Sequence, residues 1–243
     1  MPSTNRQLIL AKAALVLSNA VCTQISFSPP RPPVSPEDEK TYKADHKSRD
    51  WLPGMGRGLP WAFKVVVLLF NAAEILTLLS IAFPSEFRWM RLVSTAGRSP
   101  YISSHFIFGT IIVHLATYLR ITCYRLLGEH FTYELSIQKN HKLITHGPYA
   151  YVRHPSYAAI ILFMLGIWMA QMKPGSWYVE CGIGNTSIGG RVSGYVWMFL
   201  TLGGVALSSN RCAKEDRVLR RQFQDEWLRW HEQTPYRLVP YIY

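Results

Sequence analysis

Five apolar runs separated by polar stretches dominate the sequence. They cover residues 8–25, 61–83, 102–119, 157–172 and 192–207. The second and third approach the roughly 20 residues that an α-helix needs to span hydrocarbon, whereas the others are shorter or carry polar interruptions. The pattern therefore predicts an all-α protein, a polytopic transmembrane helical bundle of about five spans.

The first run and the segment after it each have two interpretations. Arg6 precedes an apolar stretch, as in a secretory signal, but Lys12 interrupts that stretch and no small-residue cleavage site is clear near Val21. We therefore favour a retained first helix. The segment 26–60 is rich in proline and then in charge, which predicts an extended linker, with binding to a partner as the alternative.

Composition supports a membrane protein and narrows its partners. Hydrophobic residues make up 49% of the chain and charged residues only 17%, while the formal net charge is +11. No basic helix, zinc-finger spacing or aromatic RNA-binding pattern accompanies this charge, so we expect cytoplasmic loops and no nucleic-acid partner. The four cysteines are scattered without CxxC spacing, and we expect neither a disulfide framework nor a metal site.

A few ionisable residues interrupt or follow the apolar runs. Glu74 must face protein or water at its depth, either lining a ligand cavity or bonding another helix, and the second interpretation is simpler. Arg120 and Arg125 follow the third run, where we expect them to meet lipid headgroups or an anionic ligand. With five spans, the loop 127–156 and the tail 208–243 fall on one side, which the positive-inside tendency places in the cytoplasm.

The stretch HKLITHGPYAYVRHPSY, from His141 to Tyr157, combines cationic, aromatic and turn-forming residues. Pro155 suits the first turn of a helix and biases His154 toward an extended backbone. We expect a fixed turn whose free backbone N–H groups, with the His154 and Ser156 side chains, point toward the membrane surface, because helix N-termini attract carboxylates. The alternative is an interfacial turn with a belt of tyrosines.

Together with the C-terminal residues, this stretch resembles the isoprenylcysteine carboxyl methyltransferase family, integral membrane enzymes that use S-adenosylmethionine. The family pattern His-x-Leu-Val-Thr-x-Gly-x-Tyr, then Arg-His-Pro-Ser-Tyr, reads here from His141 to Tyr149 and from Arg153 to Tyr157. A second family pattern matches Arg211, Glu215, Leu219, Phe223 and Trp227, and the ending Tyr236-Arg237-Leu238-Val239-Pro240 is also similar. The resemblance covers about residue 120 to the C-terminus.

This resemblance implies an organisation and a set of site residues. It implies a catalytic region at 120–243 with two further spans, after N-terminal helices and the linker at 1–119. The cytoplasmic cofactor site would be built from the 127–156 loop and the C-terminal helix. The residues implied in S-adenosylmethionine binding are Gln138, His141, Lys142 through its backbone, Leu143, Ile144, Tyr149, His154, Pro155, Ser156, Tyr157 and Glu215. Arg211 would be the catalytic residue that binds the substrate.

The physical properties of Arg211 and Glu215 agree with these implied roles. The two residues stand at i and i+4 and so share one helix face. The Glu215 carboxylate has the right sign for the cofactor's ribose or ammonium groups, and the forked donors of Arg211 suit a carboxylate. The alternative is an ordinary surface salt bridge, worth under about 0.5 kcal/mol.

By the same resemblance, the expected activity is methyl esterification of the C-terminal prenylcysteine carboxylate of processed CaaX-type proteins at the endoplasmic reticulum membrane. The expected partners are prenylated protein C-termini and membrane lipid. A carboxylate is already ionised at neutral pH, so this reaction needs no general base, and we expect no metal. The alternatives are a methyltransferase for phospholipids or other small lipids, whose amine acceptor would need a base, and a non-catalytic membrane scaffold.

Overall fold

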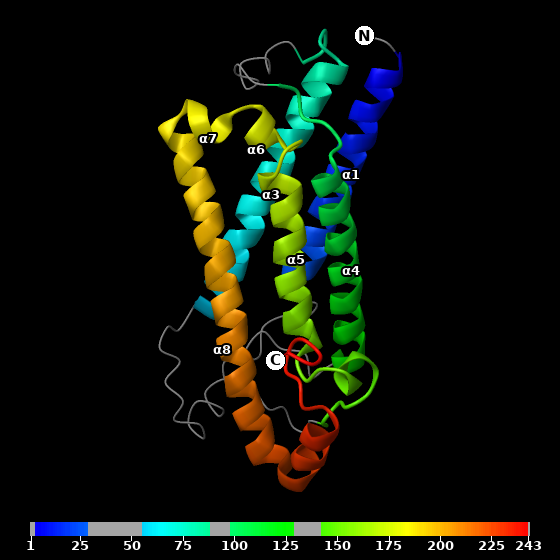
Figure 1. The fold of residues 1–243 in the computed structure, drawn as a ribbon, viewed down its shortest axis with the longest axis vertical. Helices are drawn as coiled ribbons and strands as arrows, with labels where there is room; N and C mark the ends of the chain where they lie inside the picture. The colour runs from blue at the N-terminus through cyan, green and yellow to red at the C-terminus, as the bar shows by residue number, and fades with distance from the viewer. Residues whose placement is uncertain (1–2, 29–54, 88–97, 129–141, 243) are drawn as a thin grey trace. The chain divides into compact units, whose positions relative to one another are not determined.

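The computed structural model describes residues 3–28, 55–87, 98–128 and 142–242, and every regular element in these ranges is helical. The helices are α1 (Ser3–Phe27), α3 (Met55–Ala82), α4 (Ser104–Leu127), η3 (Gly147–Ala150), α5 (Pro155–Met172), α6 (Trp177–Glu180), α7 (Ile183–Thr186) and α8 (Ile188–Gln233) (Figure 1). The predicted all-α fold class is confirmed. The linker 26–60 lies mostly outside the described residues.

Five of these helices are long and apolar enough to cross a membrane. The candidate spans are Asn5–Phe27, Gly58–Ala82, Ser104–Leu127, Pro155–Glu180 and Ile188–Gln233. The prediction of about five spans is confirmed, and the chain is a multi-pass membrane protein. Four spans correspond closely to apolar runs, whereas the last helix extends well beyond the run 192–207 into charged sequence.

The chain divides into two compact units, and each unit consists of three separate segments of the sequence. The first unit comprises Met1–Ile25, Ala62–Thr117 and Leu162–Leu202, and the second comprises Ser26–Trp61, Tyr118–Ile161 and Gly203–Tyr243. The division into an N-terminal region 1–119 and a catalytic region 120–243 stays a prediction, because it concerns function and not compactness.

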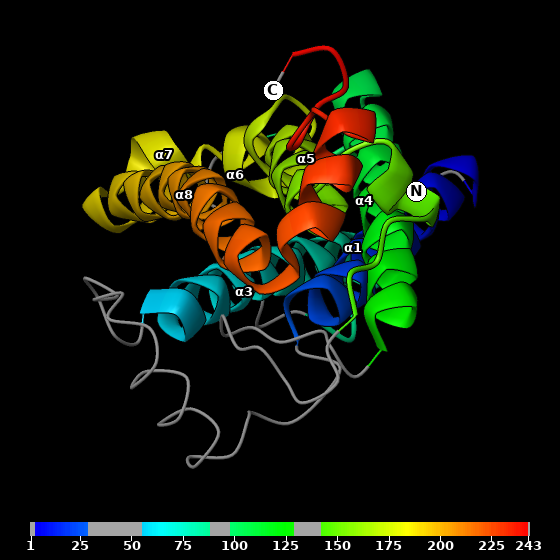
Figure 2. The ribbon, with the colours of Figure 1, turned by 90° about the horizontal axis from the view of Figure 1, so that it is seen from below.

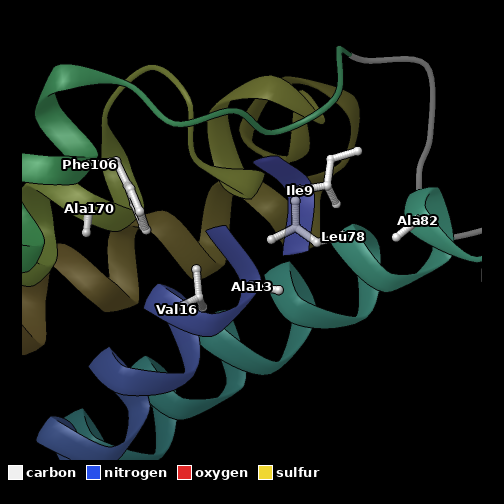
Figure 3. Close-up of a cluster of buried hydrophobic side chains, with 7 residues drawn as sticks. All are labelled: Ile9, Ala13, Val16, Leu78, Ala82, Phe106 and Ala170. Atoms are coloured by element: carbon white, nitrogen blue, oxygen red, sulfur yellow. The ribbon is translucent and has the colours of Figure 1, made fainter. Parts of the chain in front are cut away.

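The core of the first unit joins four helices through small and large apolar side chains (Figure 3). Its members are Ile9, Ala13 and Val16 of α1, Leu78 and Ala82 of α3, Phe106 of α4 and Ala170 of α5. Two glycines let α4 and α5 approach closely, since a Cβ added at Gly109 would lie 2.5 Å from the carbonyl oxygen of Gly166. Backbone contact of this kind is typical of helix packing in membranes.

An ion pair between α1 and α3 accounts for the charges buried in the first unit. Lys12 Nζ lies 2.5 Å from the Glu74 carboxylate, and both side chains are almost fully buried. The same ammonium donates to the Gly175 carbonyl oxygen at 2.5 Å. Of the two interpretations of Glu74, the structure therefore shows the bond to another helix, which is how charged groups are accommodated at membrane depth.

In the second unit, Arg120 joins the end of α1 to the start of α5. Its Nε donates to the Ser26 carbonyl oxygen at 2.7 Å, and its Nη1 donates to the Ser156 hydroxyl at 2.6 Å. Arg120 is buried, so the expectation that it meets lipid headgroups is wrong, whereas contact with an anionic ligand stays a prediction. The guanidinium has enough donors to satisfy several carbonyl and hydroxyl oxygens at once, which makes it suited to joining helix ends.

A sharp bend near its C-terminal end divides α8. Gln224 has φ 41° and ψ −109°, which are not helical values, and the chain changes direction there (Figures 1 and 2). The predicted C-terminal helix is therefore present, but Trp227 does not continue the straight face that carries Phe223. The final turns instead bring Trp227 and Trp230 into a buried cluster with Cys123 and Tyr149.

Candidate active site

The turn before α5 begins with a glycine that the backbone requires. Gly147 has φ 64°, a value that favours glycine, and a Cβ at this position would lie 2.9 Å from the Leu126 side chain. Pro148 then occupies the start of the short helix η3, and Pro155 begins α5. Both prolines stand where a helix needs no N–H donor, and for Pro155 this confirms the prediction from the sequence.

Tyr149, in η3, anchors this turn in the core of the second unit. Its side chain is buried with Cys123, Trp227 and Trp230, and the Trp230 indole N–H donates to the Tyr149 carbonyl oxygen at 3.1 Å. Burial, reinforced by the nearby Cys123 and Glu215, raises the pKa of the Tyr149 phenol well above its ordinary value. Tyr149 therefore keeps its proton at physiological pH and can act as a hydrogen-bond donor.

The rest of the turn is hydrogen-bonded to the C-terminal tail. The backbone N–H groups of Arg153 and His154 donate to the carbonyl oxygens of Tyr236 and Arg237, at 2.9 Å and 2.8 Å. The Thr234 hydroxyl donates to the Ala150 carbonyl oxygen at 3.2 Å. The predicted fixed turn is present, but the expectation of free N–H groups is wrong for Arg153 and His154, because the tail takes both.

A single buried carboxylate, Asp216 of α8, binds three side chains around this turn. His154 Nε2 lies 2.9 Å from Asp216 Oδ1. Arg153 donates to both Asp216 oxygens, at 3.3 Å and 3.2 Å, and through Nη1 to the Thr234 carbonyl oxygen at 2.7 Å. Arg237 adds a bond to Asp216 Oδ2 at 3.0 Å. Two cations and a histidine thus surround one acid, an arrangement in which a buried charge is paired and hydrogen-bonded.

The expectation that the His154 and Ser156 side chains point toward the membrane surface is wrong. His154 is buried against Asp216, and the Ser156 hydroxyl accepts the hydrogen bond from Arg120. The turn is therefore anchored by its side chains as well as by its backbone.

Glu215 is the acidic group of this region that solvent reaches. Its side chain keeps 34% of its surface exposed, and its Oε2 lies 3.8 Å from His154 Nδ1. The charges of Glu215 and Arg211 both act on the Tyr157 hydroxyl. Glu215, Tyr157, His154 and Arg211 therefore gather in one place, with a carboxylate accessible beside a phenol and an imidazole.

The structure brings together many of the predicted site residues within the second unit. Leu143 and Ile144 pack against the Tyr149 cluster, whereas Lys142 is exposed. Pro155 and Ser156 begin α5 beside His154. Gln138 and His141 lie outside the described residues.

Sequence reasoning gave no role to Asp216, Arg153 or Arg237. Asp216 follows Glu215 directly, so the sequence offered two adjacent acids, and only their different burial distinguishes them. Arg153 carried a signal in its place beside His154, although its partner lies 63 residues away in the chain.

The helices and this polar site define the class: a multi-pass α-helical membrane protein in which a His-Pro turn and the C-terminal segment build one cluster of ionisable groups. Residues 109–183 match the model of the isoprenylcysteine carboxyl methyltransferase (ICMT) family. The matched segment contains the whole turn from Gly147 to Tyr157 but not Arg211, Glu215 or Asp216.

Three named proteins are similar to this chain, each over a region of 57–69 residues. Protein-S-isoprenylcysteine O-methyltransferase B of Arabidopsis thaliana is 33% identical over 69 residues, which are 28% of this chain and 35% of that protein. Protein-S-isoprenylcysteine O-methyltransferase of Schizosaccharomyces pombe is 40% identical over 57 residues, 23% of this chain and 24% of that protein. Protein-S-isoprenylcysteine O-methyltransferase A of Arabidopsis thaliana is 31% identical over 69 residues, with 28% and 35% covered. The similarity spans about a third or less of these relatives.

Proposed function

We propose that this protein is a membrane methyltransferase that uses S-adenosylmethionine to esterify the C-terminal carboxylate of prenylated cysteine on processed CaaX-type proteins, in the endoplasmic reticulum membrane. The observation that carries the proposal is the junction between the His-Pro turn and α8. The family match covers the turn, and the structure bonds that turn to the helix that carries Arg211 and Glu215. The names of the relatives supply the reaction and the acceptor.

The polar side chains beside the turn fit S-adenosylmethionine. That cofactor carries a sulfonium, an ammonium and ribose hydroxyls, all of which suit an accessible carboxylate. Glu215 offers one, with the Tyr157 hydroxyl and His154 next to it. When bound, the cofactor supplies a methyl group activated by the adjacent sulfonium.

Several residues would hold this cofactor. Glu215, His154 and Tyr157 would contact its polar groups, while Tyr149 would shape the wall of the site from η3. The remaining contacts would come from Gln138, His141, Lys142, Leu143, Ile144, Pro155 and Ser156.

Arg211 would orient the acceptor. It lies one helical turn before Glu215 on α8, so the two side chains share a face. A guanidinium binds a carboxylate through two parallel hydrogen bonds, which fixes the direction of the attacking oxygen. Because that oxygen is already ionised at neutral pH, the chain needs no general base.

The remaining task of the protein is placement and exclusion of water. Holding two reactants in line can contribute on the order of 7–11 kcal/mol of the barrier. Removing water from the acceptor carboxylate strengthens the interactions inside the site as well. A site at the junction of apolar helices and a polar turn suits an acceptor with a prenyl tail and a charged end.

The test measures transfer of labelled methyl groups from S-adenosylmethionine to a farnesylated cysteine analogue, in membranes that lack endogenous methyltransferase. We expect base-labile label, the mark of a methyl ester. Label that appears in extracted phospholipid and not on this acceptor would instead assign the chain to lipid methylation. Absence of cofactor binding would assign it to a non-catalytic scaffold.

Arg211→Ala tests the acceptor side of the site. We expect cofactor binding to persist while turnover falls by at least about 100-fold, because the carboxylate loses its orienting partner. Arg221→Ala is the matched control, since Arg221 is an exposed arginine of the same helix. Undiminished turnover in Arg211→Ala would remove Arg211 from the site.

A further inference from the structure

Two adjacent acids on α8 have opposite environments. The Glu215 side chain is 34% exposed, whereas that of Asp216 is 6% exposed. Successive residues of an α-helix point about 100° apart, so one acid can face an open site while the next faces the protein interior. The buried acid is the one that contacts the His-Pro turn.

The hydrogen bonds of Asp216 use its full capacity as an acceptor. Oδ1 accepts from His154 Nε2 and Arg153 Nε, and Oδ2 accepts from Arg153 Nη2 and Arg237 Nε. A carboxylate offers about four lone-pair positions, and here four donors occupy them. An amide of the same shape has a single acceptor oxygen, so asparagine would leave two donors facing an NH₂ group.

These bonds also decide which nitrogen of His154 faces Glu215. An ionised carboxylate can only accept, so a proton of His154 lies on Nε2, where the bond to Asp216 is made. Nδ1 is then the nitrogen on the side of Glu215, 3.8 Å from its Oε2. Asp216 thereby fixes the ring orientation of His154 relative to the exposed acid.

We propose that Asp216 is the positioning residue of this site: it holds His154 in the tautomer protonated at Nε2 and clamps Arg153 and Arg237 around the turn, so that His154 Nδ1 and Glu215 face the cofactor together. This rests on the proposed function for the identity of the cofactor. Asp216 itself acts through its neighbours. Arg153 adds a second connection between the turn and the C-terminal segment, because it donates to both Asp216 and the Thr234 carbonyl oxygen.

The first test is a spectroscopic one on the unaltered protein. Histidine-selective ¹⁵N NMR of the full chain in detergent micelles, with His154 assigned by the loss of its signals in His154→Asn, reports which ring nitrogen carries the proton. We expect Nε2 to be protonated at a pH where the ring is neutral. A neutral His154 protonated at Nδ1 would overturn the proposal, whether or not the protein shows methyltransferase activity.

The second test compares Asp216→Asn with Asp216→Glu and with Glu226→Gln, a change at an exposed acid of α8. Carboxylates that orient a metal-binding histidine are worth about 10- to 100-fold in affinity or activity, and we expect a loss of similar size in S-adenosylmethionine binding for Asp216→Asn, because Asp216 orients His154 in the same way. The KM for the cofactor should rise more than the KM for the acceptor. Asp216→Glu keeps the charge and both oxygens, so its cofactor affinity should lie closer to that of wild type. Glu226→Gln should bind the cofactor as tightly as wild type.

The outcomes separate this proposal from the proposed function. If Asp216→Asn binds the cofactor as tightly as wild type, the positioning role is overturned while methylation stands. If Asp216→Glu is as impaired as Asp216→Asn, keeping the charge and both acceptor oxygens does not preserve cofactor binding, and the role is overturned as well. If wild type neither binds the cofactor nor transfers methyl groups, the proposed function is wrong. The tautomer of His154 then still tests whether Asp216 orients the His154 ring. If Asp216→Asn does not fold, the ¹⁵N NMR spectrum of the unaltered protein provides the same test.

Discussion

Arg153 provides the sharpest test of how the turn is held to the C-terminal segment. Its side chain is 3% exposed and donates three hydrogen bonds, two to the Asp216 carboxylate and one to the Thr234 carbonyl oxygen. Arg153→Met keeps much of the apolar stem while removing the charge and all three donors. We expect this variant to be markedly less stable than wild type.

The size of the effect follows from what remains around Asp216. Removing one partner of a buried charge pair costs about 3–5 kcal/mol when the other charge is left alone. Asp216 would keep His154 and Arg237, and the two bonds from Arg153 to Asp216 are long, at 3.3 Å and 3.2 Å. We therefore expect a loss of about 3 kcal/mol, at the lower end of that range.

The assay is thermal unfolding of the purified protein in detergent, followed by the fluorescence of its tryptophans. For chains of this size about 1 kcal/mol corresponds to about 2–4 °C, so Arg153→Met should lower the midpoint by about 6–12 °C. The unfolding midpoint of Arg153→Lys should lie between those of Arg153→Met and wild type, because an ammonium keeps the charge but cannot reproduce the forked geometry of a guanidinium. Arg221→Met, at an exposed arginine of the same unit, should change little. Equal midpoints for Arg153→Met and Arg221→Met would refute the reasoning.

Two further predictions concern the first unit. Lys12→Met should lower the unfolding midpoint, because it leaves the buried Glu74 carboxyl group without its ionic partner. Adding Glu74→Gln should restore much of the loss, and a double variant that loses more than the single one would contradict this account. Gly109→Ala should cost about 1–3 kcal/mol, because the new Cβ would meet the Gly166 backbone at 2.5 Å, whereas Gly189→Ala meets nothing within 4 Å. Thermal midpoints of these two alanine variants that coincide would show that α4 and α5 do not pack this closely.

The helices could be predicted from the sequence because apolar run length is a local property. The runs 61–83 and 102–119 needed no knowledge of neighbours to be assigned as spans. The bend in α8 could not be predicted in the same way, since Gln224 is neither glycine nor proline and carries no signal for a positive φ. After the bend, Trp227 and Trp230 pack in the Tyr149 cluster, a long-range contact that is visible only in the folded chain.

The candidate site shows the same limit. Arg211 and Glu215 could be placed on one helix face from the sequence, because residues at i and i+4 of a helix share a face and both lie in α8. The buried position of Arg120 could not be predicted, since an arginine after an apolar run ordinarily lies at the membrane surface, and only the folded chain shows the Ser26 and Ser156 oxygens that receive it. Long-range hydrogen bonds of this kind leave no periodic trace in the sequence.

The candidate site has two parts, the His-Pro turn and the C-terminal segment, and hydrogen bonds make each part depend on the other. The family match covers the turn but stops before α8. Yet the N–H groups of Arg153 and His154 are bonded to the tail, and their side chains are bonded to Asp216. A turn of this shape therefore requires a C-terminal segment that supplies those acceptors. Conversely, Asp216 bonds both His154 and Arg237, so a substitution at Arg237 would disturb the position of His154 beside Glu215 through Asp216.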